Sequence, residues 1–163
     1  MTKMNELYEQ RKISYITDSF KDLKPGSELK GKVKRPGYSL TLNPDTGDAM
    51  FFVVEDDDKG TKSIIVGGNN GHWPVEASFE LTFANSTNYV ALECFSSSWG
   101  YSRVVIYDKD GNPLHEASVD TGTVVKYSGP GIYRAVYEGP VEEFGLTMRL
   151  ISVTHGLAQI KGS

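Results

Sequence analysis

Short runs that alternate apolar and polar residues fill the chain from residue 26 onward, separated by clusters of glycine, proline, asparagine and aspartate. Alternation with a period of two is typical of strands that bury one face, and the clusters are typical of turns. The pattern predicts strands at 27–33, 38–42, 50–54, 63–66, 77–84, 89–95, 101–107, 123–127, 132–138 and 146–153. So many strands need at least two layers or one closed barrel.

The run 77–84 shows the alternation most clearly. Phe79, Leu81 and Phe83 fall on one side of this strand and polar residues fall on the other. One side should therefore meet a core and the other should meet water. We predict an all-β fold, an antiparallel, jelly-roll-like β-sandwich of about eight to ten strands.

The first 24 residues follow a different pattern. They contain neither glycine nor proline, and their apolar residues recur at roughly helical spacing between Met4 and Leu23. The pattern predicts one amphipathic helix that ends at Pro25 and Gly26. β-branched residues such as Ile16 and Thr17 disfavour a helix in the second half of this segment. The expected organisation is a helical segment at 1–24 followed by a sandwich domain at 25–163.

Composition and charge narrow the classes of partner. The formal net charge is −4 over 163 residues, and the basic residues are scattered along the chain. A nucleic-acid partner is therefore not expected. No stretch approaches the roughly 18 apolar residues that a membrane-spanning helix needs. The sequence thus predicts a soluble protein without a transmembrane segment.

The amino terminus lacks the apolar segment and small-residue cleavage site of a signal peptide. A cytoplasmic location is the default expectation, with non-classical secretion or a mature secreted fragment as the alternatives. The single cysteine, Cys94, excludes an intrachain disulfide. Its place in the apolar run 89–95 predicts a buried and unreactive thiol.

Catalytic and metal-binding patterns are weak in this sequence. The three histidines, His72, His115 and His155, do not have the spacing that directs two imidazoles at one ion. There is no Gly-x-Ser-x-Gly motif, and the serines at 96–98 have no neighbouring histidine in the sequence to act as a base. We therefore expect a protein without catalytic residues or a cofactor.

One acidic turn has two interpretations. Asp108, Asp110 and Asn112 place oxygen donors at alternate positions, as calcium-binding loops do. A hairpin turn uses the same residue types, and Gly111 does not stand where an EF-hand loop requires glycine. The hairpin turn is the preferred interpretation, and calcium remains the alternative.

Two tryptophans lie in predicted loops beside amide and hydroxyl side chains. Flat exposed rings with polar neighbours suit the recognition of a sugar or of a protein surface. The alternative is that both rings fold over the ends of the core. The candidate ligand-binding residues are Trp73, Trp99, Tyr101, Asn69, Asn70 and His72.

Three segments carry a resemblance to a known family. They are 104–114, which ends in an Asp-x-x-Gly turn, 129–137, which contains Gly-x-Tyr, and 145–150. Together, residues 79–150 resemble the jelly-roll β-sandwich modules of the bacterial pre-peptidase C-terminal type. The resemblance implies an accessory domain that binds or solubilises and has no active site of its own.

These observations predict a non-catalytic module that recognises a carbohydrate or a protein surface through aromatic and polar loops. One alternative is a component of a larger assembly, such as a toxin subunit, a secreted effector or a phage structural protein. Its contacts would be the N-terminal helix and an exposed sheet edge. A metal-dependent or hydrolytic enzyme is a second alternative. The sequence does not indicate an oligomeric state.

Overall fold

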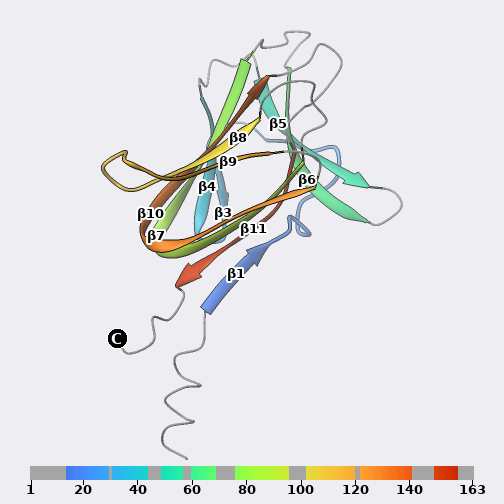
Figure 1. Ribbon diagram of the computed structural model, residues 1–163. Helices are drawn as coiled ribbons and strands as arrows, with labels where there is room; N and C mark the ends of the chain where they lie inside the picture. The colour runs from blue at the N-terminus through green and yellow to red at the C-terminus, as the bar shows by residue number, and fades with distance from the viewer. Residues whose placement is uncertain are drawn as a thin grey trace, which may run out of the picture.

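Strands make up nearly all of the regular structure in the computed structural model, which describes residues 14–29, 31–43, 49–56, 60–68, 76–95, 102–119, 122–140 and 149–157 (Figure 1). The strands are β1 (Ser14–Asp18), β2 (Glu28–Leu29), β3 (Val33–Arg35), β4 (Tyr38–Asn43), β5 (Ala49–Asp56), β6 (Thr61–Gly68), β7 (Glu76–Phe95), β8 (Arg103–Tyr107), β9 (Pro113–Ser118), β10 (Thr123–Pro140) and β11 (Arg149–Leu157). All pairings between them are antiparallel. The prediction of an all-β antiparallel fold is confirmed.

Two long strands, β7 and β10, connect the two layers of the fold. They run side by side and bend together, so that each belongs to both layers (Figure 1). In the first layer, the start of β7 pairs with β4 and the end of β10 pairs with β8. In the second layer, the end of β7 pairs with β11, which continues to β6 and β1. The result is a nearly closed sandwich.

Side chains from both layers meet in one core. Phe51 of β5 packs edge-on against Phe79 of β7, with ring centroids 5.8 Å apart. Phe79, Leu81 and Phe83 are all buried, as their alternation predicts. Cys94 is buried too, and desolvation, aided by the negative charge of Glu93, raises the pKa of its thiol to about 12. This confirms that Cys94 is a core residue.

Irregular pairing in β10 puts Tyr133 and Tyr137 on different sides of the sheet, although regular alternation of side chains along the strand would put them on the same side. The register shifts between Ser128 and Ile132 and again between Ile132 and Arg134. Strict alternation would put Tyr133 and Tyr137 on the same side of the strand. Because extra residues in one strand offset the alternation, Tyr137 is buried in the core while Tyr133 is exposed.

Several predicted strand boundaries differ from the observed ones. The runs 77–84 and 89–95 are one continuous strand, β7, and the runs 123–127 and 132–138 are one strand, β10. The run 27–33 is interrupted at Gly31, whose φ of 67° lies in the left-handed region. The sequence pattern did not predict strand β9, because its side chains are mostly half-exposed or exposed and do not alternate clearly.

The predicted N-terminal helix is wrong over residues 14–18, which form strand β1 along β11. Residues 1–13 lie outside the described part of the chain. Ile16 and Thr17 are β-branched and favour an extended backbone. The partner strand lies at the opposite end of the sequence, so local periodicity could not reveal the pairing. Within the described residues, there is no helix of the length and apolarity needed to cross a membrane.

The two faces of β7 should respond differently to truncation. Leu81→Ala removes a fully buried side chain, and we expect it to lower the free energy of unfolding by roughly 2 to 5 kcal/mol. Thr82, its neighbour on the outer face, is half-buried, and Thr82→Ala should cost under about 1 kcal/mol. Urea unfolding of both variants measures the difference. Equal losses would contradict the register described here.

Candidate functional site

The loops predicted to bind a ligand lie outside the described residues. Trp73, with Asn69, Asn70 and His72, falls between β6 and the start of β7. Trp99 and Tyr101 fall between the end of β7 and β8. The two segments therefore attach at opposite ends of one bent strand. Their role in binding stays a prediction.

The turn between β8 and β9 is held by its own polar groups. One carboxylate oxygen of Asp108 accepts hydrogen bonds from the backbone N–H of Asp110 (2.9 Å) and of Asn112 (2.8 Å). The other accepts one from the Asn112 side chain at 3.1 Å. These bonds, with those to Asn112 the strongest, lower the pKa of Asp108. Gly111 has the positive φ, 84°, that the hairpin turn requires. Asp108 and Asn112 are thus engaged with each other, while Asp110 contributes its backbone.

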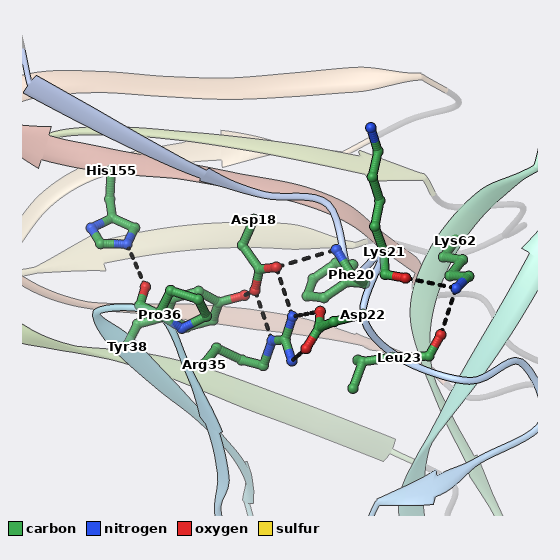
Figure 2. A network of polar contacts seen from close by, with 10 residues as sticks. All are labelled: Asp18, Phe20, Lys21, Asp22, Leu23, Arg35, Pro36, Tyr38, Lys62 and His155. Carbon is green, nitrogen blue, oxygen red and sulfur yellow. Dashed lines mark hydrogen bonds and ion pairs between the residues drawn. The ribbon is translucent and has the colours of Figure 1, made fainter.

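A buried ion pair joins β1 to the β3–β4 hairpin (Figure 2). Arg35 donates to both carboxylate oxygens of Asp18, with distances of 2.8 Å from Nε and from Nη2. Tyr38 donates its hydroxyl to Asp18 at 2.6 Å, and the Phe20 backbone N–H donates at 3.2 Å. Arg35 also binds Asp22, whose side chain is exposed.

The environment of Asp18 keeps it ionised. Burial raises the pKa of its carboxyl, but hydrogen bonds from Arg35, Tyr38 and Phe20 outweigh that effect, so the pKa is lowered overall. The pKa of Tyr38 is raised, first by burial and then by its bond to the Asp18 carboxylate. Every acceptor position of Asp18 that faces the protein is therefore used. Such a carboxylate has no free lone pair for a proton transfer, and we assign it a structural role.

The chain around Asp18 is fixed by further polar contacts (Figure 2). Phe20 has a φ of 63°, which is uncommon for a bulky residue, and its ring is fully buried. The Lys62 ammonium donates to the carbonyl oxygens of Lys21 at 2.8 Å and Leu23 at 2.6 Å. On the hairpin side, His155 donates from Nε2 to the carbonyl of Pro36 at 2.9 Å. The Lys62 bonds hold the segment after β1 to β6, and the His155 bond holds the β3–β4 hairpin to β11.

The outer face of the first layer carries charges that neutralise one another. Arg103 binds Glu116 at 2.9 Å and Glu138 at 3.2 Å. Arg134 lies 3.5 Å from Glu80 and stacks over the ring of Tyr107. Cross-strand pairs of this kind are typical of a solvated sheet surface. Among the described residues, no group of three histidine, cysteine or acidic side chains is placed to hold a metal ion.

The outer face of the second layer differs, because aromatic and hydroxyl side chains dominate it. The alternation of β7 directs Tyr89, Ala91, Glu93 and Phe95 outward, opposite the buried Val90, Leu92 and Cys94. Pairing with β1, β10 and β11 adds their outward residues. We call this surface the tyrosine face; its residues are Tyr15, Thr17, Tyr89, Ala91, Glu93, Phe95, Val124, Lys126, Ser128, Arg149, Ser152 and Thr154.

Two tyrosines meet at one end of the tyrosine face. Tyr15 of β1 and Tyr89 of β7 both pair with Gly156 of β11, which lies between them. Because Gly156 has no side chain, the two rings stack across it, with centroids 4.4 Å apart and planes 19° from parallel. A Cβ at Gly156 would approach the Ser14 carbonyl oxygen within 2.1 Å. Glycine is therefore required for this close approach.

Polar groups separate this tyrosine pair from a second aromatic position. The hydroxyl groups of Thr17 and Thr154 are hydrogen-bonded at 3.0 Å, and Ser152 donates to Glu93 at 3.2 Å. At the far end, Arg149 lies over the ring of Phe95, 5.7 Å from its centroid. At about 3.4 Å per residue, Tyr89 and Phe95 stand roughly 20 Å apart along β7. The face thus presents two aromatic positions with hydroxyl and charged groups between them.

Part of the tyrosine face could have been found from the sequence. The alternation in 89–95 already separates Tyr89, Glu93 and Phe95 from the buried residues. The contribution of Tyr15 could not be found, because it depends on the pairing of β1 with β11 at the other end of the chain.

Comparison with known proteins finds similarity to solved structures only. No family model and no curated protein matches this chain. The resemblance to pre-peptidase C-terminal modules therefore stays a prediction.

Among solved structures, the chain is similar to the CBM22-1 xylan-binding domain of Xyn10C from Paenibacillus barcinonensis, with 15% identity over 85% of this chain and 99% of that one and a TM-score of 0.41. It is also similar to the family 11 carbohydrate-binding module of the cellulase Lic26A-Cel5E from Clostridium thermocellum, with 6% identity, 82% and 97% coverage and a TM-score of 0.38. A third is the carbohydrate-binding module CBM36 in complex with calcium and xylotriose, with 14% identity, 87% and 98% coverage and a TM-score of 0.31. These values are too low to transfer a ligand or a binding residue.

The β8–β9 turn should not depend on calcium. Because the Asp108 carboxylate already accepts hydrogen bonds within the turn, we expect calcium or a chelator to leave the melting temperature unchanged. Asp110→Asn should have little effect, whereas Gly111→Ala should destabilise the turn at its positive φ. Thermal melting with and without calcium tests this. A calcium-dependent rise that Asp110→Asn abolishes would instead establish a calcium loop.

The Asp18 ion pair should make stability depend on pH. Asp18→Asn removes a buried partner of Arg35, and we expect a loss on the order of 3 kcal/mol at pH 7. Asp22 is exposed, so Asp22→Asn should cost under about 1 kcal/mol.

The folded-state pKa of Asp18 is lowered, so its contribution is complete above the unfolded value of about 3.9 and is lost as the pH falls below it. The stability gap between the parent protein and Asp18→Asn should therefore narrow in acid. Denaturant unfolding across this pH range measures it, and a gap that stays constant would contradict the assignment.

Proposed function

We propose that this chain is a non-catalytic binding module for carbohydrate. One observation carries the proposal: the tyrosine face exposes aromatic rings and hydroxyl groups on an open sheet surface. A sugar ring has an apolar C–H face that packs on an aromatic ring and a rim of hydroxyls that needs hydrogen-bonding partners. Both kinds of group are present together on this face.

The tyrosine face fits a sugar better than the outer face of the first layer does. On the first layer, both arginines are engaged by carboxylates of neighbouring strands. A ligand there would have to compete with these ion pairs. On the tyrosine face, the hydroxyls of Thr17 and Thr154 can each exchange their mutual bond for one to a ligand.

An extended chain of sugars suits this surface better than a single ring. The aromatic positions at Tyr15–Tyr89 and at Phe95 lie far apart along β7, with Glu93 and Ser152 between them. An oligosaccharide that lies along the strand would reach both positions. The predicted loop residues Trp73 and Trp99 would add further aromatic contacts if they adjoin this face.

Retardation in gels that contain soluble polysaccharides tests the proposal. We expect the parent protein to be retarded by at least one neutral polysaccharide of a panel. Tyr89→Ala and Tyr15→Ala should each weaken binding by about tenfold, because each removes an aromatic contact. Tyr133→Ala is the matched control, since Tyr133 is as exposed (39%) as Tyr15 (38%) but lies on β10 beyond the register shift at Ile132, outside the residues that define the tyrosine face.

The possible results show separately whether the protein binds carbohydrate and which residues form the binding site. Retardation by no polysaccharide of the panel would overturn the carbohydrate function and leave a protein partner as the alternative. Binding that survives Tyr89→Ala but is lost in the Trp73→Ala, Trp99→Ala double variant would place the site in the loops. Melting temperatures of all variants identify any loss that arises from unfolding.

A further inference from the structure

Strand β1 leaves an open edge on the second layer. Its partner is β11, and no other described strand pairs with it. Four of its five residues are exposed. Ile16 points to the inner side of the sheet, opposite His155, yet it is 47% exposed because no described part of the facing layer covers it. Leu157, a diagonal neighbour on β11, is 48% exposed.

Among the described strands, β2, β3, β9 and the first half of β10 also lie at edges of the sheet, and each has a feature that discourages strand addition. Strand β2 has only two residues, and β3 has three and presents Lys34 to solvent. Strand β9 begins at Pro113 and has a register shift against β8. The first half of β10, which pairs only with β7, carries the exposed Lys126. Short length, lysine, proline and bulges are the usual protections of an edge.

Strand β1 has none of these protections. Its sequence, Ser-Tyr-Ile-Thr-Asp, contains no lysine and no proline, and its register against β11 is regular. Its one charge, Asp18, is turned inward and neutralised by Arg35. A regular, exposed edge strand whose only charged side chain is buried is a template for pairing with another strand.

We propose that β1 pairs antiparallel with β1 of a second copy of this chain, about a two-fold axis at Ile16. In this register, Ile16 faces its own counterpart, so the two exposed side chains cover each other. Tyr15 faces Thr17 of the second copy, and Ser14 faces Asp18. Aromatic residues opposite β-branched ones are favourable cross-strand pairs, and no like charges meet across the edge. The strand is therefore complementary to itself, and self-complementarity is what a two-fold interface requires.

The pairing would extend the second layer across both copies. A two-fold axis through antiparallel neighbours in one sheet is perpendicular to that sheet, so both tyrosine faces would point the same way. Two ligand surfaces would then lie side by side and could engage one long polymer with higher avidity than one surface. The pairing itself does not rest on the proposed carbohydrate function, because it is argued from the edge alone.

Sedimentation of the protein without any ligand tests the pairing. A contact made by five residues a side is small, so we expect a reversible dimer whose average mass rises with concentration. Ile16→Lys should return it to a monomer, because two ammonium groups would meet at the axis. Val124→Lys is the matched control: Val124 is equally exposed, at 47%, but lies on β10. It should leave the dimer intact.

Cross-linking gives an independent measurement. Ile16→Cys should be linked between two chains by a short bis-maleimide, and Val124→Cys should not. The native Cys94 is buried, which keeps it from reacting in the folded protein. A protein that remains monomeric at the highest attainable concentration would overturn the proposal. So would a dimer that Val124→Lys dissociates and Ile16→Lys does not. Melting temperatures confirm that the variants are folded.

Discussion

The ion pair between the buried carboxylate of Asp18 and Arg35 is the interaction that positions β1, and β1 contributes to both the tyrosine face and the open edge of the sheet. A charge in this position is stable only with its full set of donors, and these come from two places in the chain: Phe20 just after β1, and Arg35 and Tyr38 in the β3–β4 hairpin. Meeting that requirement fixes the end of β1 against the β3–β4 hairpin. Both the tyrosine face and the open edge contain residues of β1, and this ion pair helps the pairing with β11 to hold that strand in place.

The same strand contributes differently to each side of the sheet. Tyr15 points outward and completes the aromatic pair with Tyr89, while Ile16 points inward and emerges past the end of the core. The alternation of a strand produces both effects from adjacent residues. The charged face of the first layer shows the opposite behaviour, since its side chains satisfy one another and leave little that a ligand could use. The proposed binding surface therefore lies on the second layer.

Local pattern predicted the interior of the fold well and its long-range pairings poorly. Phe79, Leu81 and Phe83 could be assigned to the core because alternation is a property of neighbouring residues. The sequence predicts a helix at Ser14–Asp18, because the apolar residues there suit either period and the strand's partner, β11, lies at the other end of the chain. For the same reason the sequence indicated Tyr89, Glu93 and Phe95 as a solvent side but could not bring Tyr15 to them. The loops that contain Trp73 and Trp99 lie outside the described residues, and their role in binding remains a hypothesis from the sequence.

The pairing of Ser14 with Leu157 brings the first and last described residues of the chain together. A short peptide that joined Leu157 to Ser14 in place of residues 158–163 and 1–13 would close the chain into a ring and leave the described strands in place. The ring could then be opened at the exposed β8–β9 turn, where Asp108 to Asn112 lie outside the core. Such a circular permutant would keep every neighbour in space while reversing which half of the molecule is synthesised first. In such a permutant the fold would be defined by which strands pair with each other and not by the order of the strands along the chain.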